Sequence, residues 1–245
     1  MDIARVRRAL MHRFFVAAGA VEGERGRIVG EQARQVATVL RLGAGEHVVL
    51  VQDGEEVEIA LEHVARTEAW GRVMSRRRAE TEPRIALTVA LPLLKGDHSE
   101  QALAAAVQLG ASRVVPFSSA RSVVRELPPA RRTRLERIAR ESAEVARRGR
   151  VPEIGPALEW ADLLPALDPP VLVAWEEART PLLRDALPRG DRLSLVVGPE
   201  GGLGQDEVDL ARRQGAQVVS LGRRVLRAEV AVVAAVAQLV GALDR

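Results

Sequence analysis

The chain has 245 residues and a mass of 26.6 kDa, enough to bury the core of one large or two small domains. Hydrophobic residues make up 47% and charged residues 28%, which excludes a wholly disordered chain, and no apolar run reaches the roughly 18–20 residues of a membrane span. Cysteine is absent, which excludes disulfides and cysteine-ligated metals, and the first residues lack the apolar core of a signal peptide, so we expect a cytoplasmic location.

Residues 11–75 are predicted to form the strands of a small β-barrel. An apolar run at 48–51 leads into Asp53-Gly54, after which apolar and polar residues alternate from Val57 to Leu61. Asp-Gly between two such runs is a strong signal for a β-hairpin. Shorter strands are expected at 14–16, 27–29 and 70–73. The polar segment 76–83 ends in proline and is predicted to be a linker.

After Pro83 the pattern changes to strands that alternate with helices. Strands are expected at 85–91, 113–117, 171–175, 193–197 and 217–221. Helices are expected from about 97 to 109, from 128 to about 148, at 205–214 and at 228–243. This alternation indicates an α/β domain with a largely parallel sheet.

Positive charge gathers in one segment, although the formal net charge is only +3. Residues 121–150 include ten arginines against four glutamates. A basic segment of this kind fits a polyanionic partner such as nucleic acid. Glu136 and Glu144 stand four residues before Arg140 and Arg148, so an exposed helix face with internal ion pairs is an equally good alternative.

Two glycine-containing loops are the candidate ligand-binding segments. Residues 198–202 (Gly-Pro-Glu-Gly-Gly) follow one predicted strand, and Gly222 follows another before the last helix begins. Ligands bind at the carboxyl ends of strands in open α/β sheets, so the two loops would form one pocket if their strands are neighbours. The alternatives are a plain tight turn at 198–202, a helix-start role for Glu229 and a surface position for Arg227.

Several common types of site are not matched. The sequence has neither the Gly-x-Gly-x-x-Gly fingerprint of dinucleotide-binding proteins nor a P-loop. The four histidines, at 12, 47, 63 and 98, do not stand at metal-ligand spacing, and we predict no metal site.

The order of the motifs along the chain resembles the RsmE family, the bacterial 16S ribosomal RNA uridine N3 methyltransferases of the SPOUT superfamily. Its two most informative matches are residues 198–202 and the run Ser220-Leu221-Gly222, Val225-Leu226-Arg227 and Glu229. Shorter matches lie at 12–15, 39–42 with Gly45, 95–97, 109–113, 121–123 and 151–154. The resemblance extends from about residue 11 to 243, with residues 1–10 as an extension.

The resemblance implies a PUA-like RNA-binding barrel at 11–78 and, at 84–245, a SPOUT methyltransferase domain with a trefoil knot. It also implies a homodimer that acts on 16S rRNA of the small subunit with S-adenosylmethionine (SAM) as cofactor. The implied SAM contacts are Val197, Gly198, Gly201, Gly202, Leu221, Gly222, Val225 and Leu226.

The resemblance suggests roles for three charged residues in methyl transfer. Arg227 would stabilise charge on the uracil carbonyl oxygens, and Glu229 or Glu200 would accept the N3 proton. The implied RNA contacts are Arg13, Arg41, Arg121 and Arg125.

The chain departs from the family at several positions that are usually polar. Ala228 and Val230 replace threonines, Ala105 and Gln108 replace Lys and Glu, Val145 replaces Gln, and Arg34-Gln35 replace a His pair. The alternatives are a SPOUT methyltransferase acting on tRNA or on ribose, and a non-enzymatic RNA-binding ribosome assembly factor.

Overall fold

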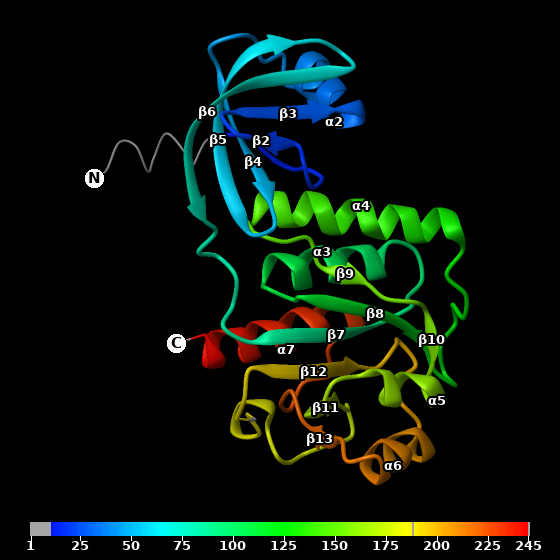
Figure 1. Cartoon of the computed structure of the whole chain (residues 1–245). Helices are drawn as coiled ribbons and strands as arrows, with labels where there is room; N and C mark the ends of the chain where they lie inside the picture. Colours follow the sequence, from blue (N-terminus) through cyan, green and yellow to red (C-terminus); the bar gives the residue numbers. More distant parts are fainter. Residues whose placement is uncertain (1–10, 188, 245) are drawn as a thin grey trace. The chain divides into compact units, whose positions relative to one another are not determined.

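The computed structural model describes residues 11–187 and 189–244, and the extension predicted at 1–10 lies outside them. The described chain divides into two compact units. The N-terminal unit consists of the residues up to Glu82 together with Arg147–Arg150. The C-terminal unit consists of Pro83–Ala146 and the residues from Val151 onward (Figure 1).

The N-terminal unit is built on a six-stranded sheet with the order β1-β4-β5-β6-β3-β2. The β1–β4 pair is parallel and the other pairs are antiparallel. Its strands are β1 (Arg13–Phe15), β2 (Val21–Glu22), β3 (Arg25–Val29), β4 (His47–Gln52), β5 (Glu55–Val64) and β6 (Glu68–Arg78). The predicted hairpin is confirmed between β4 and β5, where Asp53 (φ 51°) and Gly54 (φ 82°) are both left-handed, as a two-residue type I′ turn requires.

Two sequence predictions for this unit are wrong. The stretch predicted to contain only strands includes α2 (Gly30–Arg34) and the π-helical turn η1 (Gln35–Val39). Ala33 and Val36 are buried in the core three residues apart, which is a helical spacing. The predicted linker also begins too early, because residues 76–78 belong to β6 and pair with β5. Arg77 and Arg78 lie opposite Glu56 and Glu55, and Arg77 Nε donates a 2.7 Å hydrogen bond to Glu56 Oε2.

The segment Arg147–Arg150 completes the N-terminal unit. The side chain of Arg148 is only 2% exposed and forms an ion pair with Glu82. The Glu82 carboxylate also accepts hydrogen bonds from the backbone N–H groups of Gly149 (2.9 Å) and Arg150 (3.2 Å). A buried guanidinium is stable only when it is paired in this way.

The C-terminal unit has a seven-stranded sheet in which every pair is parallel, as predicted. The strand order is β10-β8-β7-β12-β11-β13, and the short β9 pairs with β8. The strands are β7 (Ala86–Pro92), β8 (Arg113–Ser118), β9 (Glu153–Ile154), β10 (Leu158–Glu159), β11 (Val171–Ala174), β12 (Arg192–Val197) and β13 (Gln217–Val219). The five strands expected from the sequence are therefore present, and β9 and β10 were not predicted.

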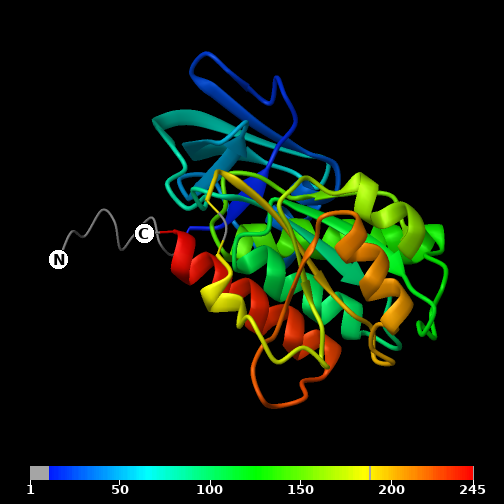
Figure 2. The same ribbon diagram turned by 90° about the horizontal axis from the view of Figure 1, so that it is seen from below.

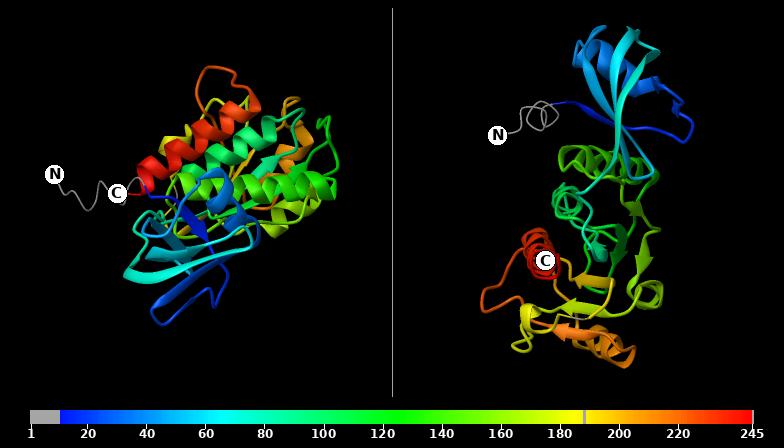
Figure 3. Two further views of the ribbon diagram at one scale, coloured as in Figure 1. Left: turned by 90° about the horizontal axis from the view of Figure 1, so that it is seen from above. Right: turned by 60° about the vertical axis from the view of Figure 1, so that its left-hand side comes forward.

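Helices cover both faces of this sheet (Figure 3). The helices α3 (His98–Gln108), α4 (Pro129–Val145) and α7 (Ala228–Leu243) lie on one face, with α3 beside α7 (Figure 2). The other face packs against α5 (Trp160–Leu163) and α6 (Gln205–Arg213) through a core that includes Phe117, Val173 and Val196. The turns η2 (Leu164–Ala166) and η3 (Leu183–Asp185) complete the unit.

The helix expected to reach about residue 148 ends earlier, at Val145. Arg147 adopts a left-handed φ of 56°, which a continuing helix does not allow. Within the described residues, no helix is both long and apolar enough to cross a membrane.

Replacing Gly71 with alanine should destabilise the N-terminal unit. Gly71 lies in β6 beside a register irregularity, and a Cβ there would overlap the carbonyl oxygen of Ala60. Because that neighbour is backbone, we expect a loss of about 1–3 kcal/mol in the free energy of unfolding. Urea denaturation followed by circular dichroism measures it. Gly43→Ala is the control, since nothing lies within 4 Å of its Cβ, and equal stability of the two variants would contradict the prediction.

Candidate functional site

A cavity of about 620 Å³ lies at the carboxyl ends of β11, β12 and β13, a volume in the range of small-molecule sites. The segments that follow these strands line it, together with the start of α7 and two residues that follow β7. Its lining includes all eight residues implied to contact SAM, and also Arg227, Glu229 and Glu200. The structure thus brings the two candidate loops together, although the strands before them, β12 and β13, are not neighbours but lie on either side of β11.

The first loop is a tight turn that is closed by an internal hydrogen bond and packs against the segment after β8. The backbone N–H of Gly202 donates to the carbonyl of Pro199 (2.9 Å), and Gly202 has a left-handed φ of 69°. A Cβ on Gly201 would come within 2.7 Å of the carbonyl oxygen of Arg121, so glycine permits close approach of the segment after β8. The alternative of a plain tight turn therefore describes the backbone correctly, but this turn also lines the cavity.

The buried carboxylate of Glu207 fixes the geometry of this region. It accepts hydrogen bonds from the backbone N–H groups of Gly204 (2.9 Å) and Ala120 (2.8 Å). Glu207 is only 8% exposed, so these charge-assisted bonds form away from water. The loop after β12 and the segment after β8 are therefore held together at one side of the cavity.

The second loop presents apolar side chains to the cavity and ends at α7. The backbone N–H of Gly222 donates to Ser220 Oγ (3.2 Å). Val225 is 86% exposed, although its side chain is apolar. Arg227 is the N-cap residue of α7, with extended backbone angles, and its carbonyl accepts a hydrogen bond from Ala231 N–H (2.8 Å).

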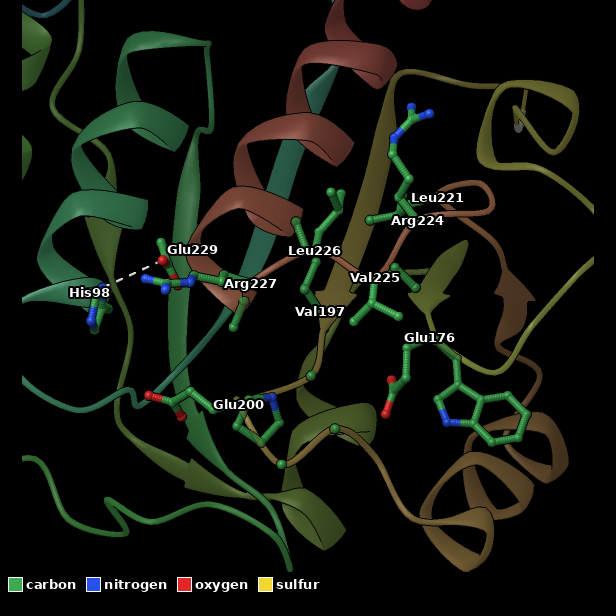
Figure 4. A pocket seen from close by; sticks show the side chains of 18 of the residues that line it. His98, Glu176, Val197, Glu200, Leu221, Arg224, Val225, Leu226, Arg227 and Glu229 are labelled. Carbon is green, nitrogen blue, oxygen red and sulfur yellow. Dashed lines mark ion pairs between the residues drawn. The ribbon is translucent and has the colours of Figure 1, made fainter.

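Charged side chains gather at one side of the cavity (Figure 4). Glu229, with 14% of its side chain exposed, lies 3.6 Å from His98, measured from Oε1 to Nδ1. Glu200 is exposed, and its Oε1 accepts a 2.9 Å hydrogen bond from the backbone N–H of Lys95. The side chain of Arg227 extends toward His98 and Glu229.

His98 was missed as a site residue because the sequence was searched only for metal-ligand spacing. Its Nδ1 atom is buried without a hydrogen-bond partner. His98 follows the 95–97 motif at the start of α3, which was the available signal. The neighbouring Asp97 is exposed, and the hydrogen bond from Gln101 lowers the pKa of its carboxyl group, so Asp97 is anionic at neutral pH.

The residues predicted to contact RNA fall into two groups. Arg41, Arg121 and Arg125 are exposed, and Arg121 Nη1 lies 3.4 Å from the carbonyl oxygen of Gly201 in the first loop. The side chain of Arg13, by contrast, is buried. It is 7% exposed and pairs at 2.9 Å with Glu56, itself 4% exposed, so its guanidinium is committed within the N-terminal unit.

The basic segment also contains both kinds of arginine. Arg131 pairs with the buried Glu100, and Arg132 donates to the carbonyl oxygens of Ile154 and Gly155. Arg134 and Arg137, by contrast, have side chains 54% and 63% exposed, with only long 4.0 Å ion pairs. Some arginines of the segment are therefore held by contacts within the C-terminal unit, and others are exposed to solvent, where a polyanionic partner could reach them.

The described part of the chain has no group of three or more histidine, aspartate or glutamate side chains placed to hold a metal ion.

Comparisons with known proteins identify the family. Residues 80–240 match the family model described as RNA methyltransferase domain. The chain is 31% identical over 217 residues to the ribosomal RNA small subunit methyltransferase E of Bacillus subtilis, covering 83% of this chain and 85% of that one. It is 33% identical over 214 residues to the enzyme of the same name from Mycobacterium tuberculosis, covering 82% of this chain and 80% of that one.

A solved structure is similar over nearly the whole length. The crystal structure of a ribosomal RNA small subunit methyltransferase E from Neisseria gonorrhoeae, bound to S-adenosyl methionine, has 27% sequence identity and a TM-score of 0.84. The similarity covers 93% of this chain and 95% of that one. The present chain belongs to the RNA methyltransferase domain family and, within it, to the family of ribosomal RNA small subunit methyltransferase E.

Proposed function

We propose that this protein transfers the methyl group of SAM to N3 of a uridine in 16S rRNA of the small ribosomal subunit. The observation that carries the proposal is the convergence of both glycine loops, Arg227 and two carboxylates on one cavity. Family membership gives the class of reaction, and the names of the relatives give the small-subunit RNA.

The residues of the cavity fit SAM. A Cβ on Gly201 or Gly202 would collide with Arg121 or Glu176, so only glycine lets the loop pack this closely against the segments after β8 and β11 at the wall of the cavity. Val197, Leu221 and Leu226 offer apolar surface to an adenine ring. Glu200 and Glu229 also line the cavity, and these carboxylates suit a cationic sulfonium. When bound there, SAM supplies an electrophilic methyl group and leaves as a neutral thioether.

Arg227 is positioned to stabilise the charge that develops on uracil. Uridine N3 carries a proton at neutral pH, and its loss places negative charge on the neighbouring carbonyl oxygens. The guanidinium of Arg227 is exposed at the cavity and offers a planar fork of donors that matches such oxygens. A preorganised charge of this kind lowers the barrier because it needs no rearrangement during the reaction.

Glu229 is the better of the two candidate proton acceptors. It is half-buried beside His98, whereas one carboxylate oxygen of Glu200 is already bonded to the backbone of Lys95. In the proposed step, Glu229 takes the N3 proton as the nitrogen lone pair forms the new bond to carbon. His98 then stabilises the position of Glu229, a contact that needs only a small shift from 3.6 Å to become a hydrogen bond.

The remaining features implied by the resemblance belong to the same proposal. The N-terminal unit would be the PUA-like RNA-binding barrel, and the C-terminal unit would contain the trefoil knot. The protein would act in the cytoplasm. A homodimer is supported by α7, where Val230 is 46% exposed and Val233 and Val240 are only partly buried within one chain.

The substrate is tested by transfer of a tritiated methyl group to small subunits that lack the modification, followed by nucleoside chromatography. We expect the label on N3-methyluridine. Label on ribose, on cytidine or in tRNA would show that another SPOUT target is correct, and no transfer would favour a non-enzymatic assembly factor.

Arg227→Ala should lower kcat by roughly 10²–10³-fold, the scale for loss of one preorganised charge-stabilising donor. SAM affinity should change little, because this side chain acts on the base that is methylated. Single-turnover methylation and calorimetry measure the two quantities. Arg223→Ala is the control, since Arg223 is exposed in the same loop but does not line the cavity. An unchanged rate in Arg227→Ala would refute this role.

Glu229→Gln should lower the single-turnover rate by roughly 10²-fold or more, as expected for loss of a general base. Glu200→Gln should have a much smaller effect, because its contact to Lys95 N–H survives with an amide oxygen. The single-turnover rate of His98→Asn should lie between the rates of these two glutamate variants. The reverse order of the two glutamate variants would assign proton transfer to Glu200.

RNA binding should depend steeply on salt, and the exposed arginines should account for part of that dependence. Replacing Arg121, Arg125, Arg134 and Arg137 with glutamine should flatten the slope of log K against log salt by about 0.7–0.9 for each lost phosphate contact. Filter binding to 16S rRNA at salt concentrations from about 50 to about 200 mM measures this slope. A matched control replaces Arg184, Arg192, Arg212 and Arg213, which are also exposed. Equal slopes for both variants would mean that the segment is only solvated.

A further inference from the structure

Glu176 is a carboxylate of the cavity that neither the sequence motifs nor the proposed reaction uses. It lies two residues beyond the end of β11 and lines the cavity. Among the described residues, its carboxylate has no hydrogen bond or ion pair, and only its backbone carbonyl accepts a bond, from Arg179 (3.2 Å). Glu176 is exposed, and a carboxylate without a protein partner at the wall of a cavity can accept hydrogen bonds from a ligand there.

The backbone that carries Glu176 is fixed on both sides. The N–H of Trp175 donates to the carbonyl of Val219 in β13 (3.1 Å), and its indole Nε1 donates to the carbonyl of Leu203 beyond the first loop (3.1 Å). Trp175 is only 8% exposed. Glu176 therefore projects from a rigid backbone support, and its exposed side chain is free to meet a ligand in the cavity.

Gly202 leaves the space that the Glu176 carboxylate occupies. A Cβ built on Gly202 would overlap Glu176 Oε1, and the left-handed φ of 69° also disfavours any larger residue there. Glycine at position 202 therefore makes room for the Glu176 carboxylate at the wall of the cavity.

Glu176 lies apart from the charged cluster of His98, Arg227 and Glu229. Figure 4 shows it across the cavity from that cluster, on the same side in this view as Val225 and Leu221. Leu221 and Val225 are among the apolar residues that line the cavity, and the sugar of an adenosine is bonded directly to its adenine ring. An adenine ring packed against this side of the cavity would bring the ribose, rather than the reacting sulfonium, next to Glu176.

We propose that Glu176 is the ribose-recognition residue of the cofactor site, accepting hydrogen bonds from the vicinal 2′- and 3′-hydroxyls of SAM. A carboxylate has two oxygens that match two neighbouring hydroxyl donors. Dinucleotide-binding folds use an acidic residue for ribose hydroxyls in the same way. The inference rests on the proposed function, because it assumes SAM as the ligand.

Calorimetric titration with S-adenosylhomocysteine tests the inference without requiring turnover. Glu176→Gln should weaken binding by roughly ten- to hundredfold, the effect of losing charge-assisted hydrogen bonds. Glu177→Gln is the matched control, because the neighbouring Glu177 is exposed but does not line the cavity. Its affinity should equal that of the unaltered protein, and circular dichroism should show both variants folded.

A second ligand separates the ribose from the amino-acid end of the cofactor. For the analogue of S-adenosylhomocysteine that lacks the α-amino group, Glu176→Gln should weaken binding by the same factor as for S-adenosylhomocysteine itself. A loss confined to S-adenosylhomocysteine would assign Glu176 to the ammonium group and overturn the inference, as would unchanged affinity for both ligands. If the unaltered protein failed to bind S-adenosylhomocysteine, the proposed function itself would fail.

Discussion

The parallel pairing of β11 with both β12 and β13 is the constraint on which the site depends. Ala174 at the end of β11 is in register with Val197 of β12 and with Val219 of β13, so the three strands end at one level. The segments that follow them therefore begin together and enclose one cavity. A shift of two residues in either pair would keep the buried faces inside but move one loop by about 6.6 Å along the sheet. The cavity walls would then no longer meet.

Two long-range contacts maintain this alignment beyond the ends of the strands. The indole of Trp175 binds the backbone at Leu203, and the carboxylate of Glu207 binds Gly204 and Ala120. The second contact joins the segment after β8, which carries Arg121, to the loop after β12. Residues proposed to contact RNA and residues proposed to contact SAM are thus connected through one buried acidic side chain.

The sequence predicted elements well where a local pattern decides the structure. The strands of the parallel sheet are apolar runs bounded by turn residues, and the hairpin at Asp53-Gly54 follows from the left-handed angles that these residues accept. The segment 30–39 was missed because its short helical pattern carries few buried residues, of which Ala33 and Val36 reveal the period only once the core is known.

The site could be predicted only in part, for a different reason. Motif order located the two glycine loops, but His98 and Glu176 reach the cavity through strand order, which no local pattern contains. Counting charges also could not distinguish Arg13 or Arg131, which are held by buried glutamates, from Arg121, which is exposed. That distinction is a property of packing, because each guanidinium is equally charged in the unfolded chain.

The contacts of Glu82 with Arg148, Gly149 and Arg150 affect how the protein is made. The Glu82–Arg148 pair joins residues 66 positions apart, so the N-terminal unit lacks part of its own structure until residue 150 has left the ribosome. By then the strands β7 and β8 and the helix α4 of the other unit have also been synthesised. The N-terminal unit is consequently not encoded by one continuous stretch of the sequence. A fragment ending at Glu82 would expose a carboxylate that has lost its partners, and exchange of the N-terminal unit between relatives would have to carry two separate stretches of sequence.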